Sequence, residues 1–393
     1  MTAISGSRQP VESSANRGHL RELDWLMLAT VGLCCLGLVM AVSVQGADPD
    51  VGPIQAMKQQ GGKLFAALAA FLVAALTPMR VVRRVALPAF LVATACCLLP
   101  LVVSNDVKGA YRWIKFGGFR FQPVEPARFF MILAVAWILA RAGTGVATFR
   151  RGFVPAAGCA SLLAGALLCQ PDHGNALIVL MLASVLALVA GVRFLHFLPI
   201  GLTGLALFVW AALQHEYVRD RLAHLMTTKP QSQVGLGLIA LASGGLTGRG
   251  LEQGWMKIDY VPEANNDFVF AIVGEEFGFL GSLFVLASFT TFGVVGYRLV
   301  CKVRDPFLRY VVCGYALMIC MQAAANLLVV SGWAPAKGID LPFVSTGGTS
   351  LMFCLAAVGL IGNAARTDLH GEFSSVGANQ GRSTAVNSYE GRV

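Results

Sequence analysis

The chain has 393 residues, of which 56% are hydrophobic and only 13% are charged, and its formal net charge is +9. About a quarter of the residues of a soluble domain are charged, so this composition excludes a soluble globular protein. Apolar runs long enough for a helix to cross a bilayer recur along the chain. They do not alternate apolar with polar residues, as the strands of a membrane barrel do. The sequence therefore predicts an all-α, polytopic integral membrane protein.

About ten transmembrane helices are predicted, and they define three regions of the chain. Residues 1–24 are polar with no signal-peptide cleavage pattern, which predicts a retained cytoplasmic tail. Residues 25–366 form the predicted membrane domain. Residues 367–393 are rich in Ser, Gly and Asn, which predicts a disordered cytoplasmic tail. The predicted spans are Trp25–Val44, Gly62–Thr77, Val85–Ser104, Pro126–Ala140, Phe153–Cys169, Gly174–Val192, Phe194–Leu213, Phe268–Gly296, Tyr310–Val330 and Phe343–Ile361.

The short turns on one side of the predicted membrane domain are rich in arginine. Four of them together carry eleven Arg or Lys residues and a single acid, Asp305. Positive residues gather in the cytoplasmic loops of membrane proteins. We therefore expect both termini to be cytoplasmic and the large loop 214–267 to be exterior.

Basic residues also occur on the predicted exterior side, most densely between Lys108 and Arg128. One explanation is pairing with neighbouring acids or with lipid phosphates. The other is an anionic ligand: Lys108 and Arg112 share a face if their segment is helical and could grip a diphosphate. The sequence contains no Walker A motif, so it shows no means of using ATP, and no nucleic-acid partner is expected.

Within the exterior loop, Val234–Ala242 is apolar but too short to span the membrane, which predicts an interfacial or re-entrant helix. It leads into Ser243–Gly250, which contains four glycines and Arg249. Glycine permits tight turns and close approach of the backbone to another group. We expect that group to be a ligand.

Acidic side chains mark the start of the eighth predicted span. Asp267 stands at its beginning, where it is either a helix cap or a functional acid. Glu275 and Glu276 follow about 12 Å deeper, with Glu275 about 80° round the helix from Asp267. Ionisable groups at such depth are costly and are functional candidates. A carboxylate in surroundings of low polarity can accept a proton near neutral pH.

The tenth predicted span begins with Lys337–Ser350, a stretch rich in Ser, Thr and Gly. This composition predicts non-helical backbone at membrane depth, which is tolerated where it packs in protein or lines a wet cavity. A helix that starts there would direct its backbone N–H groups at an anion.

Taken together, these motifs resemble the SEDS family of bacterial shape, elongation, division and sporulation proteins, over about residues 22–366. Lys337-Gly338 before Leu341-Pro342 is closer to the cell-division members than to the elongation members. Arg128 stands where the family usually has lysine, and Thr346 where it has an aromatic residue. The motifs that carry the resemblance are Lys108–Ile114, Gln122–Arg128, Gln170–Gly174, Ser243–Gly250, Pro262–Phe270, Gly274–Gly278 and Leu341–Ser350.

The resemblance implies a SEDS fold and a peptidoglycan glycosyltransferase. Such an enzyme polymerises lipid II, the undecaprenyl-diphosphate-linked disaccharide peptide, at the outer face of the bacterial cytoplasmic (inner) membrane. For a cell-division member it implies the division septum, a class B penicillin-binding transpeptidase as partner, and other divisome proteins. Asp267 would be the catalytic residue. The predicted substrate-binding residues are Lys108, Arg112, Gln122, Glu125, Arg249, Glu263, Glu275, Lys337 and Ser345.

Three questions stay open at this point. The sequence requires no cofactor, but a divalent cation, Mg²⁺ or Mn²⁺, at Glu263 or Glu275 is an option. A lipid II flippase is one rival function, although it would place ionisable groups on both sides of the membrane. A non-catalytic divisome scaffold is the other, although it would not need Asp267 at a cavity. For the transpeptidase span, Gly281, Ser282 and Gly293 offer small residues for close helix approach.

Overall fold

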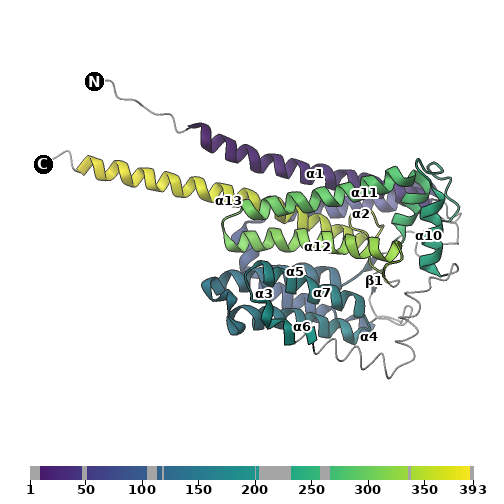
Figure 1. Cartoon of the computed structure of the whole chain (residues 1–393), viewed down its shortest axis with the longest axis horizontal. Coiled ribbons are helices and arrows are strands. Elements are labelled where there is room, and N and C mark those ends of the chain that lie inside the picture. The colour runs from purple at the N-terminus through teal and green to yellow at the C-terminus, as the bar shows by residue number, and fades with distance from the viewer. Residues whose placement is uncertain are drawn as a thin grey trace.

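The computed structural model describes residues 9–46, 51–103, 113–116, 119–199, 201–202, 232–256, 266–334 and 338–389. Long helices dominate these residues, and the strands β1 (Ile114–Phe116) and β2 (Phe119–Phe121) form an antiparallel pair with Ile114 opposite Phe121. The helices, labelled in Figure 1, are α1 (Gln9–Gln45), α2 (Gly52–Leu76), α3 (Met79–Cys96), α4 (Pro100–Val103), α5 (Val124–Ala142), α6 (Val154–Cys169), α7 (His173–Val189), α10 (Gln233–Ser243), α11 (Val269–Lys302), α12 (Pro306–Val330) and α13 (Gly348–Tyr389), with short turns at Gly143–Ala147, Phe149–Phe153 and Phe194–His196.

Eight helices among the described residues are long and apolar enough to cross a membrane. They correspond to eight of the ten predicted spans. The sixth predicted span is α7, an apolar helix of 17 residues. The seventh, Phe194–Leu213, lies largely outside the described residues. The chain is thus a multi-pass membrane protein, and its α-helical class is as predicted.

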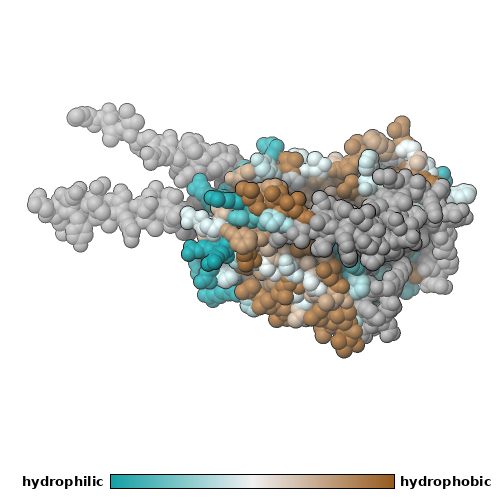
Figure 2. All heavy atoms as spheres, turned by 60° about the horizontal axis from the view of Figure 1, so that its bottom comes forward, coloured by the Kyte–Doolittle hydropathy of each residue, from teal (hydrophilic) through white to brown (hydrophobic). Residues whose placement is uncertain are grey.

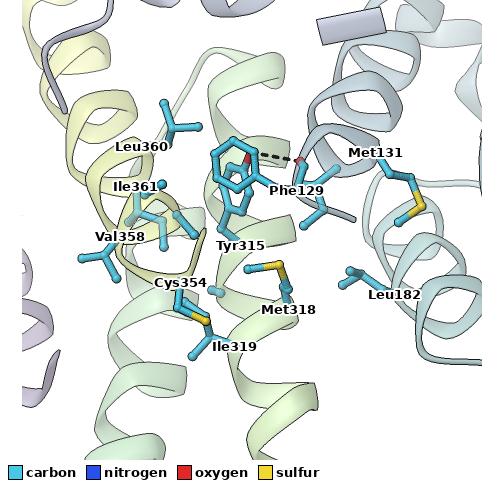
Figure 3. Close-up of a cluster of buried hydrophobic side chains, with 14 of the residues drawn as sticks. Phe129, Met131, Leu182, Tyr315, Met318, Ile319, Cys354, Val358, Leu360 and Ile361 are labelled. Atoms are coloured by element: carbon cyan, nitrogen blue, oxygen red, sulfur yellow. Dashed lines mark hydrogen bonds between the residues drawn. The ribbon is translucent and has the colours of Figure 1, made fainter. Parts of the chain in front are cut away.

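The helices run side by side in two groups, which Figure 1 shows one above the other. In one group α1 packs on α11, and α13 packs on α2; in the other α3 packs on α5, and α6 on α7. Helix α12 joins the groups through contacts with α5 and α7. Figure 3 shows this junction, where Tyr315 of α12 donates a hydrogen bond of 3.2 Å to the Phe129 carbonyl of α5. The core is therefore shared between the two groups.

The outer surface of the helical body is apolar. In Figure 2 hydrophobic residues cover its flank, and hydrophilic residues gather toward the end from which α1 and α13 project. Side chains such as Phe65, Leu76 and Val102 are more than three-quarters exposed. In water such a surface would be unstable, whereas lipid tails solvate it.

Several helix boundaries differ from the prediction, and α1, for example, begins at Gln9 and not at Trp25. Helix α2 begins at Gly52, ten residues before Gly62. Helix α13 begins at Gly348, because Pro342 and the left-handed backbone of Phe343 (φ 66°) precede it. It then continues to Tyr389, across the segment predicted as a disordered tail, since no proline follows Pro342 to interrupt it.

Helix α11 is broken inside its length. Gly278 has φ 66° and ψ −155°, a conformation outside the helical region that suits glycine. The sequence did not reveal this break, because a glycine within an apolar span is common in membrane helices. Helix α10 packs beside the broken segment, at the end of the molecule away from the projecting helices (Figure 1).

Candidate active site

Asp267 lies in the turn that precedes α11, and its side chain is half-buried. The N-cap of α11 is Phe268, and no side-chain hydrogen bond caps the helix. The backbone carbonyl of Asp267 accepts a hydrogen bond of 2.7 Å from Asn326 Nδ2 of α12. Gly338 lies beside its carboxylate, because a β-carbon there would be 3.2 Å from Asp267 Oδ2.

The segment 338–347 lies opposite the turn at Asp267. It precedes α13 and is non-helical, as predicted. Ser345 Oγ donates to the Asn266 carbonyl at 2.6 Å and accepts from the Leu341 N–H at 2.8 Å. Thr346 Oγ1 donates to Asn266 Oδ1 at 2.8 Å. The hydroxyls at this start of α13 thus join the segment to the turn that carries Asp267. The predicted site residue Ser345 acts here as part of that joint.

Residues of α2 and β2 contact the same segment and the first turn of α13. Lys63 Nζ donates to the Thr346 carbonyl at 2.9 Å. The carbonyl of Arg120, whose residue is exposed, accepts from Thr349 Oγ1 at 3.2 Å. Gln122 is buried, and its backbone N–H lies 3.4 Å from Thr349 Oγ1. The ammonium group of Lys63 is therefore held close to the segment before α13, where a developing negative charge would be stabilised.

Glu125 belongs to a buried polar network. Arg128 is 1% exposed, and its Nη2 donates to Glu125 Oε2 and, at 2.9 Å, to Gln322 Oε1. Gln322 Nε2 in turn donates to the Asp340 carbonyl at 3.0 Å. A buried charge pair of this kind is favourable only with such supporting hydrogen bonds. Glu125, predicted to bind substrate, is thus joined through Arg128 to the segment that lines the site.

The glycine-rich loop Ser243–Gly250 approaches α11. A β-carbon on Gly248 would overlap the Glu276 carbonyl. Gly250 N–H donates to that carbonyl at 3.1 Å, and Phe279 N–H donates to the Gly245 carbonyl at 2.9 Å. These bonds satisfy backbone groups that the break at Gly278 leaves without helical partners. The expected close approach is therefore real, but its partner is the α11 backbone.

The side chains of Glu275 and Arg249 make hydrogen bonds to backbone groups in and just after this loop. The Glu275 side chain is 0% exposed, and its Oε1 accepts from the Trp255 N–H at 2.8 Å and the Met256 N–H at 3.3 Å. Arg249 Nε donates to the Ser243 carbonyl at 3.3 Å. In the structure Arg249 holds the glycine-rich loop, and Glu275 holds the backbone of Trp255 and Met256 just after it. Glu276, also buried, accepts a hydrogen bond from Ser43 of α1.

Four predicted site residues lie outside the described residues: Lys108, Arg112, Glu263 and Lys337. The described part of the chain contains no group of three or more His, Cys, Asp or Glu side chains that could hold a metal ion. Glu275, one of the two candidate ligands, already accepts backbone hydrogen bonds. No step of the chemistry is therefore derived through a metal.

The sequence reasoning missed Lys63, Gln322 and Asn326 as parts of the site. Gln322 and Asn326 are both 1% exposed in the middle of an apolar helix. Their spacing of four places both on one face of α12. Polar residues inside a membrane span are functional candidates, so this pair carried a usable signal.

The sequence matches the family model described as cell cycle protein, of the FtsW, RodA and SpoVE type, over residues 24–370. It is 34% identical over 351 residues to a probable peptidoglycan glycosyltransferase FtsW of Geobacter metallireducens, covering 86% of this chain and 93% of the relative. It is 37% identical over 278 residues to stage V sporulation protein E of Bacillus subtilis, covering 68% and 76%.

Solved structures are similar in fold. A chain from a peptidoglycan synthase complex, described for its coordination of polymerization and crosslinking, matches with a TM-score of 0.72 at 28% identity, covering 87% of this chain and 96% of that chain. RodA of Thermus thermophilus matches with a TM-score of 0.62 at 27% identity, covering 87% and 95%. The chain therefore belongs to the cell cycle protein family of FtsW, RodA and SpoVE, which is the SEDS family that its motifs resemble.

Proposed function

We propose that this protein is a peptidoglycan glycosyltransferase that polymerises lipid II into glycan strands during septal cell-wall synthesis. The names of its FtsW relatives support the reaction type. The observation that carries the proposal is the placement of Asp267. Its half-buried carboxylate lies beside Gly338, where the turn before α11 meets the segment 338–347.

The chemistry needs one base and a site for a leaving anion. In the proposed reaction the 4-hydroxyl of the acceptor sugar transfers its proton to Asp267. Its oxygen forms a bond to the anomeric carbon of the donor. The bond between that carbon and the lipid diphosphate breaks, and the diphosphate leaves with the electron pair. A carboxylate suits this role when it lies within about 3 Å of the hydroxyl.

Cations would stabilise the departing diphosphate. We assign this role to Lys108 and Arg112, because a guanidinium fork and an ammonium group both bind phosphate oxygens. Lys63 lies near the segment 338–347, because its Nζ donates a hydrogen bond to the Thr346 carbonyl. Preorganised positive groups of this kind commonly supply a large part of catalysis. The energy for polymerisation comes from the diphosphate linkage of the substrate.

We assign this site to the outer face of the bacterial cytoplasmic membrane. Helices α1 and α13 project from one end of the molecule, and α10 lies toward the other (Figure 1). Helix α10 packs on α11, and the turn at Asp267 directly precedes α11. The arginine-rich turns favour a cytoplasmic position for the end with the termini. Labelling a cysteine at Ser232 should therefore succeed from outside intact cells, and labelling only from the cytoplasm would refute this orientation.

The proposed partner is a class B penicillin-binding transpeptidase, with other divisome proteins around it. Its support is the similarity to a chain of a peptidoglycan synthase complex. The surface we expected for its span needs one correction. Gly293 is half-buried, and a β-carbon there would lie 3.4 Å from Cys320 Sγ of α12, so part of its surface already packs on α12. The exposed residues Phe279, Leu280 and Leu283 of α11 are better candidates.

Labelled lipid II given to the purified protein with its transpeptidase tests the function. Glycan strands should form with the wild-type protein and fall below detection with Asp267→Asn. A lipid II flippase would move the lipid in vesicles without forming strands, and a scaffold would do neither. Strand formation undiminished in the Asp267→Asn protein would refute the catalytic role.

A further inference from the structure

Asn326 joins two segments that are far apart in the sequence. Its Nδ2 donates to the Asp267 carbonyl and to the Ile339 carbonyl, each at 2.7 Å. The orientation of the amide follows from chemistry, because two carbonyl oxygens accept hydrogen bonds and only the NH₂ group can donate them. One side chain therefore fixes the distance between the turn of Asp267 and the segment 338–347.

Gln322, one helical turn from Asn326 on α12, makes a similar pair of hydrogen bonds. Its Nε2 donates to the Asp340 carbonyl, and its Oε1 accepts from Arg128 Nη2. The two amides thus hold neighbouring carbonyls of the segment 338–347 against α12. Only the Asn326 amide also reaches Asp267.

Helix α12 is a rigid support for these amides. Tyr315, Met318 and Ile319 on the same helix are buried in the junction of the two helix groups (Figure 3). A side chain on such a support keeps its position better than one on a loop. Asn326 itself is 1% exposed, and its Oδ1 has no hydrogen-bond partner among the described residues. The NH₂ group of Asn326 therefore donates two hydrogen bonds, whereas the buried oxygen of the same amide accepts none among the described residues.

We infer that Asn326 is a positioning residue for Asp267, which it holds at a fixed place opposite Gly338. This inference rests on the proposed function. The hydrogen bond from Asn326 goes to the backbone carbonyl of Asp267, so it acts on the rate through the direction of the carboxylate. A displacement of about 1 Å at a catalytic group can cost about 10²-fold in rate. Loss of the amide should therefore lower kcat and leave the KM for lipid II nearly unchanged.

The chain offers a matched control for this inference. Asn363 of α13 donates its own Nδ2 to two carbonyls, Ala74 at 2.9 Å and Thr77 at 2.7 Å. That joint ties α13 to the end of α2, away from Asp267. The same substitution at the two asparagines removes the same kind of bonds, so a general loss of stability should affect both variants.

The test compares Asn326→Ala, Asn326→Ser and Asn363→Ala, each purified with the transpeptidase and assayed with labelled lipid II. We expect kcat to fall by about 10–100-fold for Asn326→Ala, less for Asn326→Ser, which keeps one donor, and by under about twofold for Asn363→Ala. Melting temperatures should fall similarly in the two alanine variants.

Two results would overturn the inference. One is an equal kcat for the Asn326 and Asn363 variants. The other is a failure of Asn326→Ser to fold while Asn363→Ala folds, which would give Asn326 a general structural role. Wild-type protein that makes no strands refutes the proposed function instead, so the two failures are distinguishable.

Discussion

The two ends of this molecule use the same bonds for different purposes. At the end with the projecting helices, Asn363 and Asp368 tie regular helices to each other and to the turn before α12. At the opposite end, Asn326, Ser345 and Thr346 tie irregular backbone to irregular backbone. The first kind of joint holds a shape that the helices already have. The second fixes segments that have no repeating hydrogen bonds of their own.

Backbone strain follows the same division. Gly278 and Phe343 both have φ 66° near the candidate site, and loop glycines fill the gap at the break in α11. Unfavourable backbone conformations persist where the surrounding structure fixes them, and they are common at functional sites. This comparison predicts that equal substitutions cost most in activity at the end with Asp267.

The largest effect is expected at the break in α11. Gly278→Ala would make a β-carbon overlap Gly248 N and impose a strained φ, at a cost of about 1–3 kcal/mol from the backbone alone. The loop and the start of α11 should shift, and strand synthesis should fall by about 10²-fold. Gly293→Ala is the control, since it lies in the same helix with ordinary contact to Cys320. Equal rates for the two variants would contradict the role of the break.

A smaller effect is expected beside the carboxylate. In Gly338→Ala the new methyl group would lie 3.2 Å from Asp267 Oδ2, so the carboxylate should shift by a few tenths of an ångström. We expect kcat to fall about tenfold at an unchanged melting temperature. Gly61→Ala, where nothing lies within 4 Å of the added carbon, should keep the wild-type rate. A normal kcat for Gly338→Ala would mean that the carboxylate is not confined there.

The smallest effect on activity is expected at the end of the molecule from which α1 and α13 project. The Asp368 carboxylate accepts from the Arg304 and Asp305 N–H groups, both at 3.0 Å, before α12. Asp368→Asn removes the charge from these bonds and should cost about 1 kcal/mol of stability. Strand synthesis should stay within about twofold of wild type. A large loss of rate without a loss of melting temperature would show that the two ends are coupled.

Composition and periodicity predicted the regular part of this fold. The apolar runs gave the spans, the short run Val234–Ala242 gave α10, and the Ser, Thr and Gly residues before α13 gave its non-helical start. The break at Gly278 was not predictable in this way, because its cause is a loop about thirty residues earlier in the chain. Sequence pattern records local preference, whereas such contacts are set by tertiary packing.

The candidate site was predictable to a similar degree. Asp267 stood out as an acid at the start of an apolar span, and its placement agrees with that reading. Glu275 and Arg249 carried the same kind of signal, yet Arg249 holds the glycine-rich loop and Glu275 holds the backbone just after it. Charge at membrane depth marks a residue with a specific partner, and it does not say whether that partner is substrate or backbone. Asn326 needed the structure, because its two partners are carbonyls from separate segments.

The most direct test of the assignment compares Asp267→Asn with Glu275→Gln. Both substitutions replace a carboxylate by an amide of nearly equal size, in residues eight positions apart, one in the turn before α11 and one in its second turn. General-base catalysis contributes about 10²–10⁴-fold, so the Asp267→Asn protein with its transpeptidase should make no detectable glycan from lipid II. Glu275→Gln should retain partial synthesis with a loosened exterior loop. Near-normal synthesis by Asp267→Asn, measured with intact folding and partner binding, would contradict the central claim.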